Sequence, residues 1–208
     1  MESVSASLES QGYQCDAALD HQELIPFVKS YIFKRNSVSL SYFLLNVLFL
    51  ILLIVASFIH VFQDTLTFSQ SFLQVIIGFA ITFLLIPLHE GLHGVAYRIC
   101  GAKNVSFKAN WKKLYFMAIA DKFITTRKSF YVIGLTPFVV ISLCLLILVS
   151  CSTPGMQIAW LSVLVMHASM CVGDFGLLSY FAENKSREVI SFDDAENGIS
   201  YFYSRTFK

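Results

Sequence analysis

Long apolar segments alternate with polar segments along this chain of 208 residues. The apolar segments are residues 39–62, 70–97, 130–151 and 156–181. Each is long enough to cross the hydrocarbon core of a bilayer as a helix, which takes about 20 mostly apolar residues. The pattern predicts an all-α integral membrane protein with about four transmembrane helices, whose transmembrane domain covers residues 39–182.

The composition supports a membrane protein. Hydrophobic residues make up 56% of the chain and charged residues only 14%, whereas soluble proteins carry about 25% charged residues. The formal net charge is +1, which argues against a nucleic-acid partner bound through a basic surface. The five cysteines form no CxxC pair, so they indicate reduced packing residues rather than a disulfide framework. The expected partner is the lipid bilayer.

The basic residues predict the orientation of the spans. All 15 Lys and Arg residues precede the first span, lie between the second and third spans, or follow the fourth. The links at residues 63–69 and 152–155 contain none. Because cytoplasmic loops carry the excess of Lys and Arg, both termini and the central link are expected in the cytosol.

The segments outside the spans are shorter and more polar. In the cytosolic N-terminal segment, residues 1–38, apolar residues recur at helical spacing over residues 24–32. This spacing predicts a short helix on the membrane surface, and an irregular tail is an equally open alternative. Residues 183–208 are expected to form a cytosolic C-terminal tail. In the central link, alternating apolar residues over 105–111 precede a second apolar stretch, and together they predict a β-hairpin at residues 105–120.

Ionisable residues are concentrated on the second and fourth spans. Such groups cost roughly 2.5–3.5 kcal/mol at the bilayer centre and are usually functional. His89 and His93 are four residues apart, so on a helix they lie on one face and can bind one metal ion. Glu90 stands beside them, where a carboxylate can act as general base on a metal-bound water. The alternative is that these side chains only bond to neighbouring helices.

Asp174 is the candidate for a third metal ligand. His89 lies nine residues before Arg98, and Asp174 lies nine residues before Glu183. Since both spans end on the same side of the membrane, the two residues are expected at similar depth. The sequence thus predicts one zinc ion held by His89, His93 and Asp174, with iron and cobalt as open alternatives.

Three further residues are candidates for a second shell or a substrate path. His167 precedes Asp174 by seven residues, about 10 Å along a helix, so it is too distant to bind the same ion unless the helix is distorted. Cys171 has the alternative role of a small buried hydrophobic residue. Pro137 frees a backbone carbonyl and kinks its span, which either opens a path for water or substrate or is an ordinary kink. No substrate-binding residue is predicted.

The order of these motifs carries a family resemblance. His89-Glu90-x-x-His93, a proline-bearing span and Asp174 within Gly-Asp-x-Gly resemble the site-2-protease type of intramembrane zinc metallopeptidase. More narrowly, they resemble the small bacterial membrane proteins grouped as zincin peptidases. The resemblance covers residues 70–182 and implies zinc ligands at His89, His93 and Asp174, water activation by Glu90, and a place in the bacterial cytoplasmic membrane. The Asn/Pro-rich surroundings of the site-2-protease aspartate and its PDZ-like module are missing.

These features lead to three function hypotheses. The first is a zinc-dependent intramembrane endopeptidase that cuts a membrane protein or peptide, with the hairpin receiving the extended substrate. The second is a non-catalytic metal-binding membrane protein, such as a sensor, scaffold or accessory subunit. The third is a transport or immunity-type protein, in which His167 and Cys171 would matter as much as the paired histidines.

Overall fold

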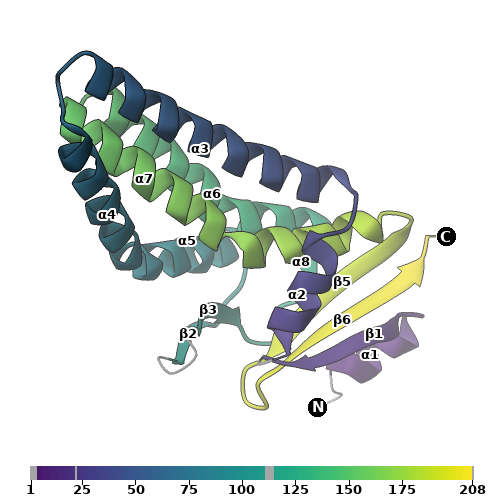
Figure 1. Ribbon diagram of the computed structural model, residues 1–208. Coiled ribbons are helices and arrows are strands. Elements are labelled where there is room, and N and C mark those ends of the chain that lie inside the picture. Colours follow the sequence, from purple (N-terminus) through teal and green to yellow (C-terminus); the bar gives the residue numbers. More distant parts are fainter. Residues whose placement is uncertain (1–3, 22, 111–114, 208) are drawn as a thin grey trace.

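The computed structural model describes residues 4–21, 23–110 and 115–207 and is mostly helical (Figure 1). The helices are α1 Val4–Ser10, α2 Leu24–Ile32, α3 Ser37–Phe62, α4 Phe68–Leu84, α5 Ile86–Ile99, α6 Arg127–Ser150, α7 Pro154–Met170 and α8 Val172–Glu183. The strands are β1 Gln14–Asp20, β2 Val105–Asn110, β3 Tyr115–Ala120, β4 Thr125–Thr126, β5 Arg187–Asp194 and β6 Ile199–Thr206.

All four predicted apolar segments are helical, and two of them are broken. By length and composition, α3 and α6 could each cross a membrane. The pairs α4–α5 and α7–α8 qualify only if each pair counts as one span, because they bend by 43° and 44°. The described residues therefore provide two to four candidate spans, consistent with a membrane protein.

The first bend has a clear local cause. Pro87 occupies the start of α5, where it has no N–H to continue the hydrogen bonding of α4, and where a proline is well tolerated. The second bend, at Cys171, contains no proline. There the Cys171 N–H donates to the His167 carbonyl at 3.2 Å, and the Phe175 N–H donates to the Cys171 carbonyl at 3.1 Å. Helical hydrogen bonding thus continues around this bend.

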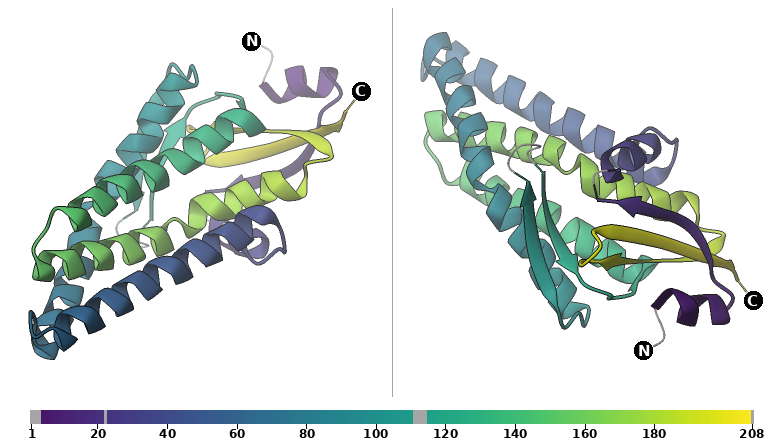
Figure 2. Two further views of the ribbon diagram at one scale, coloured as in Figure 1. Left: turned by 90° about the horizontal axis from the view of Figure 1, so that it is seen from above. Right: turned by 90° about the horizontal axis from the view of Figure 1, so that it is seen from below.

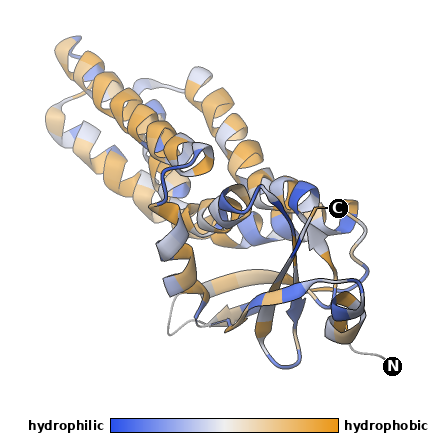
Figure 3. Ribbon diagram, turned by 90° about the vertical axis from the view of Figure 1, so that its right-hand side faces the viewer, coloured by the Kyte–Doolittle hydropathy of each residue, from blue (hydrophilic) through white to orange (hydrophobic). Residues whose placement is uncertain are grey.

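Helix α7 lies inside the bundle, while α3 and α4 present apolar outer faces. Ile158, Val163 and Leu164 of α7 are fully buried. Gly78 of α4 lies against α7 so closely that a Cβ there would overlap the Ala159 carbonyl. Many large apolar side chains of α3 and α4 are exposed, and apolar residues dominate this end of the molecule (Figure 3). An apolar surface of this extent needs lipid or a partner to cover it.

A four-stranded antiparallel sheet corrects the prediction of an all-α fold. Its strand order is β1-β6-β5-β4, so it unites the N-terminal segment with the segment expected to be a C-terminal tail. The pairing of β1 with β6 runs from Gln14↔Ser204 to Asp20↔Ile199. The ion pair between Arg187 and Asp16, at 3.1 Å, joins the same two ends of the chain.

The sheet is covered on both faces. Helix α1 packs on one face, in a cluster with Ile190, Phe192 and Tyr203. Helices α2 and α8 pack on the other face, where Val189 and Phe202 meet Leu24 and Phe181. Adjacent residues of β5 are therefore both buried, which removes the alternating pattern that would have revealed the strand.

Helix α2 confirms the helical alternative for residues 24–32. It packs against α8 at Gly176, where a Cβ would overlap the Val28 side chain. Gly173, the other glycine of the Gly-Asp-x-Gly motif, faces open space instead. Only Gly176 thus serves the close helix approach that small residues permit.

The predicted β-hairpin is confirmed within the described residues. Strands β2 and β3 pair from Val105↔Ala120 to Asn110↔Tyr115. The link between the two strands, residues 111–114, lies outside the described residues. The hairpin packs on α5, with Phe107 filling the space beside Gly94. The hairpin, the four-stranded sheet and both chain ends lie at the same end of the bundle (Figures 1 and 2).

Candidate metal centre

The two helix bends place the predicted ligands side by side. His89, Glu90 and His93 lie on α5, shortly after the first bend. Asp174 lies in the first turn of α8, directly after the second bend. An acidic side chain is favoured in the first turn of a helix, because the peptide dipoles leave partial positive charge there.

Two imidazole nitrogens and both oxygens of one carboxylate converge at this point. The Asp174 carboxylate lies 3.3 Å from His89 Nε2 through one oxygen and 3.1 Å from His93 Nε2 through the other. The two Nε2 atoms are 3.1 Å apart. Ligands bonded at about 2.0–2.1 Å to a tetrahedral ion lie roughly 3.3 Å from one another. The two imidazole nitrogens and the carboxylate oxygens are therefore spaced as ligands of a single zinc ion.

The outer nitrogen of His93 is held by a backbone carbonyl. Its Nδ1–H donates to the Ile133 carbonyl of α6 at 2.9 Å. That carbonyl precedes Pro137 by four residues, so the helix offers it no N–H. The proline thus supplies the acceptor that orients His93 and leaves the Nε2 lone pair directed at Asp174.

The outer nitrogen of His89 faces another histidine. His89 Nδ1 lies 3.2 Å from His167 Nε2 on α7. With the proton on His89 Nδ1, His167 Nε2 is the acceptor, and the Nε2 lone pair of His89 also faces Asp174. Two imidazole lone pairs and a carboxylate in contact repel one another unless a cation lies between them. This donor set therefore fits a divalent metal ion, and partners on the outer nitrogens are typical of metal-binding histidines.

The comparison with protein families agrees with a zinc site. The family model described as "Putative zincin peptidase" matches residues 82–188, just over half of the chain. The chain belongs to this family. No curated protein and no solved structure matches it. The matched segment contains the candidate metal centre and the hairpin of this zincin peptidase family member, but not β1 or β6.

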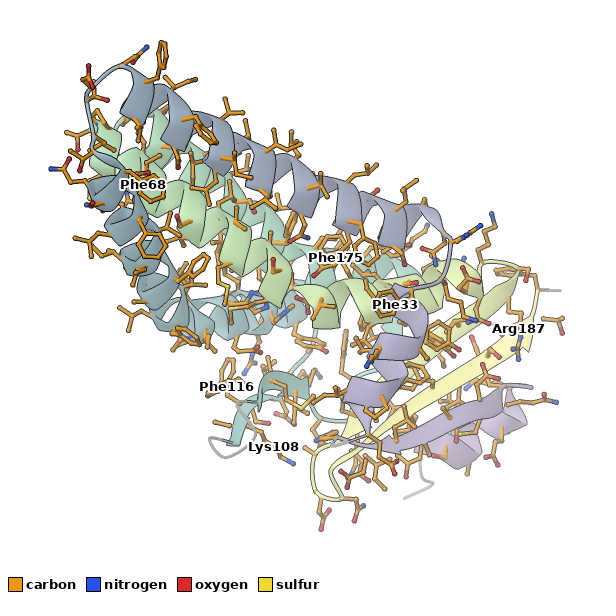
Figure 4. The ribbon with its side chains drawn as sticks, viewed as in Figure 1. Phe33, Phe68, Lys108, Phe116, Phe175 and Arg187 are labelled. Atoms are coloured by element: carbon orange, nitrogen blue, oxygen red, sulfur yellow. The ribbon has the colours of Figure 1, made fainter. Side chains whose placement is uncertain are left out.

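Glu90 lies beside the three candidate ligands and is fixed by the hairpin. Its Oε2 accepts a hydrogen bond of 2.8 Å from the Ala118 N–H of β3. Glu90 and Phe116 line two cavities, and Phe116 lies beneath α5 (Figure 4).

The two cavities differ in their surroundings. The smaller, of about 160 Å³, lies among α4, α5 and α7 and is lined by Thr82, Leu85 and His167, among others. The larger, of about 280 Å³, extends from Glu90, His93 and Asp174 to the four-stranded sheet. Gly173 and Gly134 line it as well, and the absence of a side chain at Gly173 leaves room beside Asp174.

His167 and Cys171 lie close to the candidate metal centre. His167 reaches this site through His89. Among the described residues, the possible ligand group that contains Asp174 is completed by His89 and His93. Cys171 is fully buried, with its Sγ 3.9 Å from His167 Nε2. The ligand atoms of His89, His167 and Cys171 form a second group close enough to hold an ion.

Several contacts of the site were not predicted. The Ala118 N–H and the Ile133 carbonyl are backbone groups, which a search for ionisable side chains does not find. Pro137 was a usable signal for the carbonyl, because a proline within a helix always frees one. The sheet residues at the end of the larger cavity carry no motif.

Proposed function

We propose that this protein is a zinc-dependent intramembrane endopeptidase. The observation that carries the proposal is the convergence of His89, His93 and Asp174 within 3.3 Å of one another, with Glu90 beside them and open to two cavities. Membership of the zincin peptidase family supports peptide hydrolysis. The broken apolar helices that carry these residues support a site within the membrane.

The protein's residues have distinct roles in this proposal. His89, His93 and Asp174 would hold the zinc ion, which when bound lowers the pKa of a water molecule and polarises a carbonyl. Glu90 accepts the proton of the attacking water and returns it to the leaving amine. The Ala118 N–H keeps the Glu90 carboxylate in place during both transfers. Ile133 and His167 orient the histidines.

The hairpin is proposed to present the substrate. Strand β3 lies along both the Glu90 carboxylate and the larger cavity, so an extended peptide beside it would pass the metal centre. Extended peptides commonly bind to the edge of a strand. Replacement of Phe116, which lines both cavities, should slow cleavage without removing the metal.

The orientation remains part of the proposal. The segments that carry the basic residues lead to the end of the bundle where the sheets and termini lie (Figure 1). With that end in the cytosol, as the charge distribution predicts, cleavage would occur near the cytosolic side of the bilayer.

A Glu90→Gln variant tests the chemistry. The amide keeps the shape of the side chain and its acceptor for Ala118 but cannot take the proton. Cleavage of a membrane peptide should fall by roughly 100- to 10,000-fold, while bound zinc stays at the wild-type level. Undiminished cleavage by the variant would contradict the mechanism. Zinc binding by a wild type that cleaves nothing would instead favour a non-catalytic metal-binding membrane protein.

A further inference from the structure

The larger cavity ends on a polar patch of the four-stranded sheet. Val189 and Phe202 make the inward face apolar where α2 and α8 cover it. Further along β5 and β6, and on the neighbouring β4, polar side chains line the cavity. These residues are Thr125, Ser191, Asp193 and Ser200. The cavity thus has a second polar region at the sheet, apart from the one formed by Glu90, His93 and Asp174.

Asp193 is the acidic residue of this patch, and its side chain is only 17% exposed. The Ser200 hydroxyl donates a hydrogen bond of 2.5 Å to Oδ1. Burial, together with the charge of Asp121, raises the pKa of Asp193 to about 6, although Ser200 and Lys108 act against this shift. The carboxylate therefore lies in surroundings that compensate its negative charge poorly.

The neighbouring cationic groups offset the charge of Asp193 only in part. His21 Nε2 lies 4.0 Å from Oδ1, but burial and Lys108 lower the pKa of His21, so this imidazole is neutral at pH 7. Lys108 of β2 instead donates to the Ala195 carbonyl at 2.6 Å (Figure 4). Asp193 thus remains available to a cation that enters the cavity.

We propose that Asp193, oriented by Ser200, is a subsite for a lysine or arginine side chain of the substrate. This inference rests on the proposed endopeptidase function and specifies its substrate. One cavity connects Glu90 and Asp174 with Asp193, so a peptide positioned for cleavage could reach both. Asp193 and Ser200 lie beyond the segment that the family model matches.

The position of the sheet explains why a basic side chain is the fitting ligand. Lys and Arg residues flank the cytosolic ends of membrane spans, and the sheet lies at the end of the bundle that the proposal places in the cytosol. A substrate span would leave the bilayer beside the metal centre, with its basic flank toward Asp193. Its apolar part would extend toward the smaller cavity among α4, α5 and α7. Asp193 would thereby set the direction of the bound peptide.

Peptide binding to the Glu90→Gln protein tests the subsite without requiring cleavage. The probes are fluorescent peptides with a leucine/alanine span of about 20 residues and a flank of serine and glutamine. In a series, one lysine occupies each of the first flank positions in turn. At the best position, lysine should tighten binding about tenfold over the all-glutamine parent, as measured by fluorescence anisotropy in detergent.

Two further variants in the Glu90→Gln background assign this preference to one residue. Asp193→Asn keeps the shape and the acceptor for Ser200, and it should make the lysine and glutamine peptides bind equally. Asp64→Asn is the matched control, because Asp64 is an exposed residue with φ of 54° in the distant α3–α4 link, a conformation that asparagine tolerates. It should leave the lysine preference intact.

The outcomes separate the subsite from the proposed function. No preference for lysine at any position, or a preference that survives Asp193→Asn, overturns the subsite. If the zinc-loaded wild type cleaves the peptides without that preference, the endopeptidase stands and the subsite fails. If the preference depends on Asp193 but the wild type cleaves none of the peptides, the subsite stands and the endopeptidase fails.

Discussion

The helical bundle and the four-stranded sheet serve one cavity but are built differently. In the bundle, the candidate ligands lie on α5 and α8 and are placed by two bends within apolar segments. In the sheet, Asp193 and Ser200 are placed by pairing between β5 and β6, with β1 from the opposite end of the chain beside them. In the proposed enzyme, the bundle supplies the residues for the chemistry and the sheet supplies those that select the substrate. Changes in one region should therefore spare the other.

The largest expected effect on stability is in the sheet, through the buried charge of Asp193. Its pKa rises from 3.8 to about 6 on folding, so the folded state holds this proton more tightly than the unfolded state. Stability is then lost as the pH rises from about 4 to 6. The free energy of unfolding of Asp193→Asn should therefore increase relative to wild type by up to about 3 kcal/mol over this interval. Above pH 7 the difference should stay nearly constant.

Unfolding in detergent at pH 4.5 and pH 7.5 measures this gain. Bound zinc should be the same in both proteins at pH 7.5, because Asp193 is not part of the metal centre. A stability difference that does not change with pH would contradict the account of a buried, poorly compensated carboxylate.

The next effect concerns the bundle alone. His167→Leu removes the acceptor for His89 Nδ1, and loss of such a partner typically weakens metal binding 10- to 100-fold. His167→Gln, which keeps an acceptor, should restore most of the affinity. The matched control is His60→Leu, because His60 contacts Thr65 and Gln157 far from the site. Zinc titration against a competing chelator gives the affinities, and equal losses in the variants at positions 60 and 167 would refute the orienting role.

The smallest effect is expected at Pro137. In Pro137→Ala, the new N–H can bond to the Ile133 carbonyl and compete with His93 Nδ1. Since a carbonyl oxygen can accept two hydrogen bonds, His93 keeps part of its support, and zinc affinity should fall by about tenfold or less. The same chelator titration measures it. A loss larger than that of His167→Leu would show that the proline does more than free this carbonyl.

The bundle could be predicted from the sequence because its signals are local. Apolar runs marked the spans, and the spacing of His89 and His93 required only one helix. Asp174 and His89 are equally far from the ends of their two apolar segments, which predicted the same depth for both. The bends could not be derived in this way, because the second one, at Cys171, contains no proline.

The sheet could not be predicted, because its signals are neither local nor periodic. Strands β1 and β6 pair residues as distant as Gln14 and Ser204. Strand β5 is buried on both faces, so its apolar residues do not alternate. Asp193 thus appeared as one of several acidic residues in a tail, and only the fold shows that it lines the cavity of the metal centre.

The central claim is that His89, His93 and Asp174, from two broken helices, hold one zinc ion. The most direct test is the zinc content per chain of the wild type and Asp174→Ala, purified side by side in detergent without chelator. The account predicts about one zinc per chain in the wild type and a clear loss in the variant. A wild type that contains no metal, or a variant that retains the full amount, would contradict it.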